Sequence, residues 1–240
     1  MKIFSWTNVR LVVVFAVAIF LFAFSSHRNA NRRISKADVV LDNASELFLS
    51  PQAVNKLLIE KNSPSGTVAK ENLDLNKLEM AVNAHEMVEK SQVFVSVDGT
   101  LKAVVKQKTP VVRVFDETGS YYIDYDGHRM PLSKLHTARV PLVTGSLEVK
   151  DTAGLHQVFR VLHDDDFLKK NITSIGIKPS GSLEMTNRNF DYVIEFGQAV
   201  NIERKFRNYK AFFQKSAKDS TIRKYKKINL RFTQQVVCTK

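Results

Sequence analysis

Two short acidic clusters have the residue types that could bind a metal ion. One is His163–Asp166 and the other is "DYDGH", Asp124–His128. Clustered carboxylates supply the oxygen ligands of hard cations. Consecutive helical residues point in different directions, however, which favours a solvated helix end for the first cluster. In the second, Asp126-Gly127 lies between two β-rich runs, so we expect a two-residue hairpin turn there rather than a metal site.

A basic helix near the end of the sequence has the charge to bind phosphate groups. Its basic side chains are Arg204, Lys205, Arg207, Lys210, Lys215 and Lys218. Its apolar side chains recur at helical spacing on the other side, at Ile202, Phe206, Tyr209 and Phe213. The aromatic rings therefore lie on the packing side and not where they would stack on bases. We interpret the basic set as a solvated face and expect no nucleic-acid partner.

The sequence lacks the motifs of the common enzyme classes. It has no G-x-S-x-G, no P-loop, no dinucleotide-binding fingerprint and no H-E-x-x-H. The single cysteine, Cys238, excludes an intrachain disulfide and any multi-cysteine metal site. We expect no catalytic residues, no metal, no cofactor and no small-molecule substrate. The formal charge of +12 suits an anionic lipid, a nucleic acid, an acidic polymer or an acidic protein partner, and charge alone does not choose among them.

The N-terminal region carries one hydrophobic segment, "LVVVFAVAIFLFAF", Leu11–Phe24. Counting from Trp6 to Ser26 reaches the roughly 20 residues that a bilayer span needs. We expect a tail over residues 1–10, a transmembrane helix over 11–26 and a linker over 27–35. A cleaved signal peptide is the alternative, because small residues follow the segment. Basic residues after the segment outnumber those before it, which taken alone favours an N-terminus outside the cell.

The pattern over residues 36–109 predicts a small domain of order β-α-α-β-β. "ADVVLD" reads as a strand, and Ser50-Pro51 has the residue types of a helix start. Asn76 and Glu79 have capping-box spacing at the start of a second helix. Two β-rich runs then flank Asp98-Gly99, which predicts a hairpin with a two-residue type I′ turn.

Residues 110–240 predict a mostly antiparallel β domain with two helices. The first helix has Leu155, Val158, Phe159 and Leu162 on one face, and the second is the basic helix. With the hydrophobic segment and the first domain, the predicted fold class is α+β.

The chain closes on "RKYKKINLRFTQQVVCTK", which predicts one long edge strand over residues 226–238. Strict alternation points Phe232 inward with Ile228 and Leu230, and points Arg231 outward with Asn229, Thr233 and Gln235. An edge strand offers unpaired N–H and C=O groups to another chain, so we expect this strand to bind a partner.

In this order, the segments resemble the bacterial FtsQ/DivIB family. The stretch from Leu73 to Val114 is similar to that family's second helix and hairpin, in a domain that looks like a POTRA domain. "SYYIDYDGHRMPLS", "ARVPLVTG" and "KKINLRFTQQVV" resemble segments of its β domain. The resemblance implies a single-pass inner-membrane protein with a cytoplasmic N-terminus and periplasmic domains. It also implies a non-enzymatic role at the division septum that bridges early and late division components.

The same resemblance implies the partners. Proteins of this family bind the FtsB–FtsL pair through the edge of the β domain, and other division proteins through the POTRA domain. Carried over by position, the partner-binding residues are Asn229, Leu230, Arg231, Phe232, Thr233, Gln234 and Gln235. Arg231 would meet an acidic group of the partner, while the backbone of the strand would pair with a partner strand.

Two other functions fit parts of the pattern. A POTRA-like domain also suits a chaperone or assembly module of the cell envelope, although such proteins carry repeated POTRA units or a barrel. A membrane-bound or secreted enzyme acting on an anionic polymer would require acid and base residues converging in a pocket.

Overall fold

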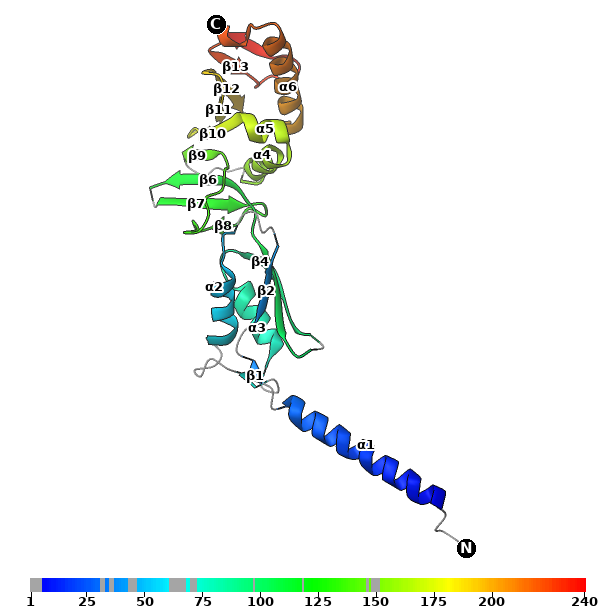
Figure 1. Cartoon of the computed structure of the whole chain (residues 1–240). Coiled ribbons are helices and arrows are strands. Elements are labelled where there is room, and N and C mark those ends of the chain that lie inside the picture. Colours follow the sequence, from blue (N-terminus) through cyan, green and yellow to red (C-terminus); the bar gives the residue numbers. More distant parts are fainter. Residues whose placement is uncertain are drawn as a thin grey trace. The chain divides into compact units, whose positions relative to one another are not determined.

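The chain forms two compact units, Met1–Gln107 and Lys108–Lys240 (Figure 1). This computed structural model describes residues 6–30, 33–34, 37–42, 47–60, 68–69, 73–96, 98–117, 119–145, 147 and 152–240. The division between the units lies two residues before the predicted domain boundary. The predicted tail and linker lie partly outside the described residues.

The hydrophobic segment is helical and longer than predicted. Helix α1 spans Trp6–Ala30, and Asn8–Arg28 within it is long and apolar enough to cross a membrane. At 1.5 Å per residue, these 21 residues extend about 31 Å, close to the roughly 30 Å hydrocarbon core of a bilayer. The large apolar side chains of α1 are exposed along its length.

The N-terminal unit contains the predicted β-α-α-β-β order, together with two short strands that were not predicted. Its elements are β1 (Arg33–Ile34), β2 (Asp38–Leu41), α2 (Pro51–Asn55) with the π-helical turn η1 (Lys56–Glu60), β3 (Val68–Ala69), α3 (Leu75–Asn83), β4 (Val88–Val95) and β5 (Leu101–Gln107). Strands β2, β5 and β4 form a sheet in that order, with β2 parallel and β4 antiparallel to β5. The helices and the sheet share a core that includes Val54, Leu58, Leu78, Val82, Leu101 and Ala103.

The starts of the two helices show one correct and one wrong prediction. Ser50 caps α2 as predicted, because its Oγ accepts a hydrogen bond from the backbone N–H of Ala53 (3.1 Å). Asp74, and not Asn76, caps α3, with Oδ1 accepting from the backbone N–H of Lys77 (3.1 Å). Aspartate caps helices as well as asparagine does, and here it starts the helix earlier than predicted.

Both Asp-Gly hairpins exist, but their connections have three residues rather than two. At Asp98-Gly99, the N–H of Ser96 donates to the carbonyl of Thr100, and the N–H of Gly99 donates to the carbonyl of Ser96 (both 2.9 Å). Gly99 has φ 85°, and Asp98 is not in the left-handed region. A type I′ turn needs positive φ at both central residues, so the turn is not of the predicted type. The same pattern occurs at Asp126-Gly127, where Gly127 has φ 88°.

The C-terminal unit is built on a nine-stranded sheet. Its strands are β6 (Pro110–Asp116), β7 (Gly119–Asp124), β8 (Arg129–Met130), β9 (Leu142–Gly145), β10 (Ile172–Ile177), β11 (Leu183–Asn187), β12 (Val193–Gly197), β13 (Lys227–Asn229) and β14 (Val237–Thr239). Their order in the sheet is β14-β13-β12-β11-β10-β9-β6-β7-β8. Most neighbouring pairs are antiparallel, as predicted; β6–β9, β9–β10 and β12–β13 are parallel.

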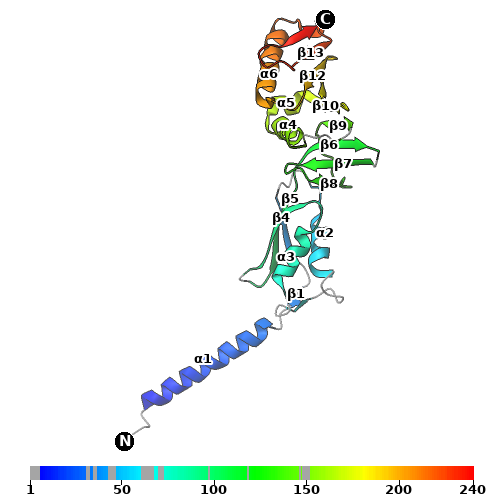
Figure 2. The same ribbon diagram turned by 180° about the vertical axis from the view of Figure 1, so that it is seen from behind.

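Three helices cover one face of this sheet, as Figures 1 and 2 show from opposite sides. They are α4 (Thr152–Asp164), α5 (Asp166–Asn171) and α6 (Ile202–Lys218), and a short 3₁₀ turn, η3 (Ile222–Lys224), follows α6. The predicted apolar face of α4 is buried, and so are Ile202, Phe206 and Tyr209 of α6. The second helical pattern was predicted correctly, whereas α5 was not anticipated. The acidic cluster His163–Asp166 contains the N-cap of α5. Oδ1 of Asp165 accepts hydrogen bonds from the backbone N–H groups of Phe167 and Leu168.

The side chain of Lys205 links α6 to the end of β12 by hydrogen bonds. It is 2% exposed, and Nζ donates hydrogen bonds to the carbonyls of Phe196 (2.9 Å) and Gln198 (2.8 Å). Lys205 was therefore wrongly predicted to belong to the solvated basic face of the helix. Burial lowers the pKa of its ammonium group because desolvation disfavours the charged form.

A buried hydrogen-bond network also holds α6 on the sheet. The hydroxyl of Tyr209 accepts from Nδ2 of Asn187 on β11 (3.0 Å) and lies 2.9 Å from the hydroxyl of Tyr192, next to β12. Burial raises the pKa of both tyrosines. Helix α6 is thus fixed to two strands near the C-terminal edge of the sheet.

Replacing Lys205 with methionine should destabilise the C-terminal unit. Lys205→Met keeps the apolar stem but leaves the carbonyls of Phe196 and Gln198 without their charged donor, a loss of about 1–3 kcal/mol. Urea unfolding of the solubilised full chain measures it. Arg204→Met is the matched control, since Arg204 is exposed on the same helix. Equal stability of the two variants would show that Lys205 does not carry this role.

Candidate partner-binding edge

The closing segment forms a hairpin and not the single strand predicted over residues 226–238. Strands β13 and β14 pair antiparallel, and residues 230–236 connect them. Strand β13 also pairs with β12, in parallel. At the end of β13, the side chain of Asn229 accepts a hydrogen bond from the backbone N–H of Arg231 (2.9 Å) and turns the chain. The edge strand is therefore β14.

The predicted partner-binding residues lie at this hairpin, but their side chains face different ways. Asn229 ends β13, Leu230 is buried in the core, Thr233 is half-buried, and Arg231, Phe232, Gln234 and Gln235 are exposed. The inward orientation predicted for Phe232 is wrong, because its side chain is 52% exposed. Strand alternation stops at Leu230, so Phe232 belongs to the connection. The outward orientation predicted for Arg231 agrees with the structure.

Strand β14 has an unpaired backbone edge. Among the strands that the structure describes, its neighbour is β13 on one side, and no strand lies on the other. Val237 of β14 is 40% exposed, whereas Cys238 packs against the core. Burial raises the pKa of the Cys238 thiol. What this edge offers to a partner is main-chain hydrogen bonding beside an exposed apolar side chain.

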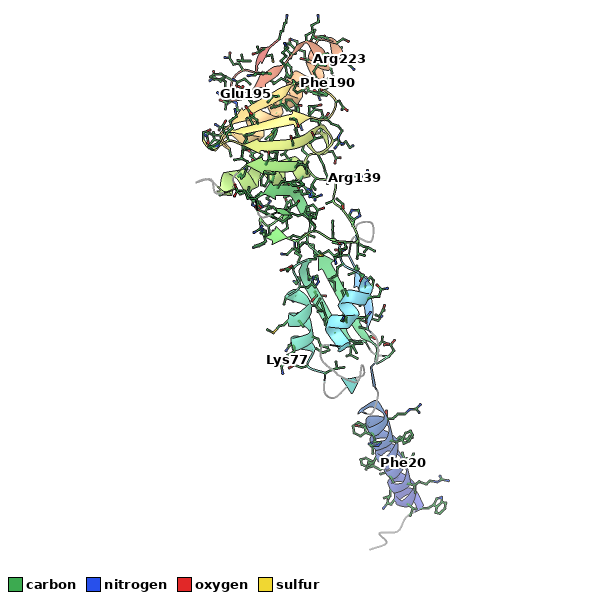
Figure 3. All side chains as sticks on the ribbon, turned by 90° about the vertical axis from the view of Figure 1, so that its left-hand side faces the viewer. Phe20, Lys77, Arg139, Phe190, Glu195 and Arg223 are labelled. Atoms are coloured by element: carbon green, nitrogen blue, oxygen red, sulfur yellow. The ribbon has the colours of Figure 1, made fainter. Side chains whose placement is uncertain are left out.

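The surface around the hairpin is basic. Residues 223–240 include Arg223, Lys224, Lys226, Lys227, Arg231 and Lys240 and no acidic residue. Glu195 of β12 lies 3.8 Å from Nζ of Lys227 and 3.6 Å from Nη2 of Arg231. Figure 3 looks onto this unit from the side without helices and labels Glu195. One carboxylate thus faces two of the basic side chains, and the excess charge suits an acidic partner.

Three contacts that the sequence pattern did not reveal hold residues 230–236 in place. Asn208 of α6 donates from Nδ2 to the carbonyl of Thr233 (2.9 Å). The N–H of Leu230 donates to the carbonyl of Glu195 (2.9 Å). Arg231 packs over Gly197, where an added Cβ would lie 2.9 Å from its Cγ. The glycine after "VIEF" was the one visible signal, since strand glycines often mark a close approach.

The acidic clusters do not form a metal site in the described ranges. No group of three or more His, Cys, Asp or Glu side chains there is arranged to hold a metal ion. Within "DYDGH", Asp124 is buried and its Oδ1 accepts from the backbone N–H groups of Asp126 and His128. The cluster therefore stabilises its own turn, as predicted.

Comparison with known proteins assigns the C-terminal unit to a family. A family model described as "FtsQ/DivIB, C-terminal related" matches residues 109–239, more than half of the chain. The chain belongs to the FtsQ/DivIB family. The matched range contains all nine strands of the sheet, including β13 and β14.

One curated relative of this FtsQ/DivIB chain is the cell division protein FtsQ of Salinibacter ruber. It is 30% identical over 155 residues, which cover 58% of this chain and 59% of that protein. The match thus spans less than two thirds of the relative. Among solved structures, the major extracytoplasmic domain of the cell division protein DivIB from Geobacillus stearothermophilus aligns with a TM-score of 0.31 and 14% identity. That alignment covers 48% of this chain and 97% of the other.

Replacing Gly197 with alanine should disturb the hairpin. Gly197 has φ +77°, which costs a residue with a side chain about 1–2 kcal/mol, and the new Cβ would collide with Arg231. We expect Gly197→Ala to lower the free energy of unfolding by at least that amount in urea titrations. Gly176→Ala on β10 is the control, because the nearest atom to its Cβ is 3.9 Å away and its φ is ordinary. A Gly197→Ala chain as stable as this control would contradict the packing described.

Proposed function

We propose that this chain is a membrane-anchored, non-enzymatic cell-division protein that recruits an FtsB–FtsL-like partner by accepting its strand at β14. The observation that carries the proposal is the edge of β14, which has no strand beside it among the described strands, in a closing segment with six basic and no acidic side chains. Membership of the FtsQ/DivIB family supports the cell-division role.

Backbone pairing at β14 would supply much of the affinity. A partner strand laid beside Val237–Thr239 extends the sheet by β-augmentation, with main-chain hydrogen bonds along the edge. Val237 and Phe232 add exposed apolar surface close to that edge in sequence. Of residues 229–235, Leu230 contributes by anchoring the connection in the core rather than by touching the partner.

Charge would select the partner. The last 18 residues carry six basic and no acidic side chains, so an acidic segment is attracted and a basic one repelled. Arg231 is exposed, and its 3.6 Å pair with Glu195 leaves other guanidinium N–H groups for a partner carboxylate.

The remaining parts fit the same role. Helix α1 has the length of a membrane anchor. The N-terminus would lie in the cytoplasm, and residues 36–240 would lie in the periplasm at the division septum. Residues 36–109 would act as a POTRA-like domain that binds other division proteins, and residues 110–240 as the partner-binding β domain. The chain would thereby bridge early and late components of the division machinery.

Reversing the charge of Arg231 should weaken partner binding. We expect Arg231→Glu to reduce co-purification of the FtsB–FtsL-like pair from solubilised membranes at least about tenfold, as loss of a charge-assisted contact implies. The substitution also sets two carboxylates side by side at Glu195. The double variant Arg231→Glu/Glu195→Arg removes that repulsion and should still fail to recover the partner.

The matched control exchanges another ion pair of the same sheet. Lys178 and Glu184 are paired away from the hairpin, and Lys178→Glu/Glu184→Lys should recover the partner normally. If the Arg231→Glu chain recovers the partner as well as the parent chain does, Arg231 is not a partner contact. Recovery restored by the Glu195 exchange would show that Arg231 only holds the connection in place.

A further inference from the structure

The N-terminal unit contains a longer edge strand than β14. Strand β4, Val88–Val95, has eight residues and lies at one end of the order β2-β5-β4. A long edge strand is a template for pairing with another chain, and proteins commonly block such edges. If the outward backbone groups of β4 already have hydrogen-bond partners, another strand cannot pair with them.

The pairing with β5 shows which groups of β4 face away from the sheet. The N–H of Ser96 donates to the carbonyl of Thr100, so these opposed residues form a hydrogen-bonded pair. In an antiparallel pair, such residues alternate with residues whose N–H and C=O groups point outward. Counting back along the register, Ser91 and Val93 have outward-pointing backbone groups.

Two side chains of α3 accept hydrogen bonds from these outward N–H groups. Oδ1 of Asn83 lies 2.7 Å from the backbone nitrogen of Ser91, and Oε2 of Glu79 lies 3.0 Å from that of Val93. Glu79 and Asn83 are four residues apart, so they lie on the same side of the helix. Their spacing matches the two-residue repeat of the outward donors. The side-chain oxygens thus take the place of carbonyls from a neighbouring strand.

We propose that Glu79 and Asn83 cap the edge of β4 and prevent a strand from adding there. A strand laid beside β4 needs the N–H groups of Ser91 and Val93 for its own carbonyls, and both donors are engaged. The two edges then differ: helix side chains engage two outward N–H groups of the eight-residue strand β4, and no described strand lies beside the outer edge of the three-residue strand β14. The proposal is independent of the function proposed for β14.

Removing the acceptor oxygens tests the cap. In Glu79→Met/Asn83→Leu, both side chains keep a similar size but lose the oxygen atoms that accept the two hydrogen bonds. We expect amide hydrogen exchange at Ser91 and Val93 in the solubilised full chain to accelerate roughly tenfold or more, as for opened edge groups. Exchange at Gln92, which faces β5, should stay unchanged. Light scattering should show self-association at concentrations where the parent chain shows none.

The matched control keeps the oxygens and exchanges the charges. Glu79→Gln/Asn83→Asp retains an acceptor at each position, so its exchange rates and association should equal those of the parent. Unchanged exchange at Ser91 and Val93 in the Met/Leu variant would overturn the cap. Fast exchange in the Gln/Asp variant would also overturn it, because loss of charge or packing would then explain the effect. A Met/Leu variant that exchanges fast but associates no more than the parent would refute the blocking role.

Discussion

A strand at the end of a sheet leaves one row of N–H and C=O groups without a strand neighbour, and these groups must find other partners. The two units of this chain differ in whether the outward backbone groups of β4 and β14 have partners. In the N-terminal unit, side-chain oxygens of α3 engage the outward N–H groups of β4. In the C-terminal unit, β14 keeps an open edge within the described part of the chain. We interpret this contrast as favouring strand addition at β14 over β4.

An open edge is useful to a partner only if its neighbours are rigid. Around β14 that rigidity comes from α6, which is joined to the sheet by buried polar contacts as well as by apolar packing. Lys205 binds the carbonyls at the end of β12, and Asn208 binds the connection between β13 and β14. Gly197 allows Arg231 to lie directly over the backbone. These contacts hold the hairpin in one conformation, which would reduce the entropy lost on binding the proposed partner.

Periodicity predicted the elements whose residues alternate or recur regularly. The apolar faces of α4 and α6, the β-α-α-β-β order and the hairpins all followed from local pattern. The break in the closing strand did not, because "INLRF" alternates as a strand would, while the Asn229 turn and the pairing with β12 decide its end. Lys205 and Asn208 were missed for a related reason: a basic or polar residue on an amphipathic helix looks solvated unless its partner, distant in sequence, is known. The family resemblance predicted partner binding at residues 229–235, which stays a prediction, and in the structure the edge strand of this region is β14.

Site-specific photo-crosslinking tests the central claim, that a partner strand binds along β14, most directly. A photoreactive phenylalanine analogue would replace Val237 on β14 or, as the control, Phe115 on β6, since both side chains are similarly exposed. In dividing cells, position 237 should crosslink to the FtsB–FtsL-like pair, and position 115 should not. Equal crosslinking at both positions, or crosslinking at 115 alone, would contradict the account.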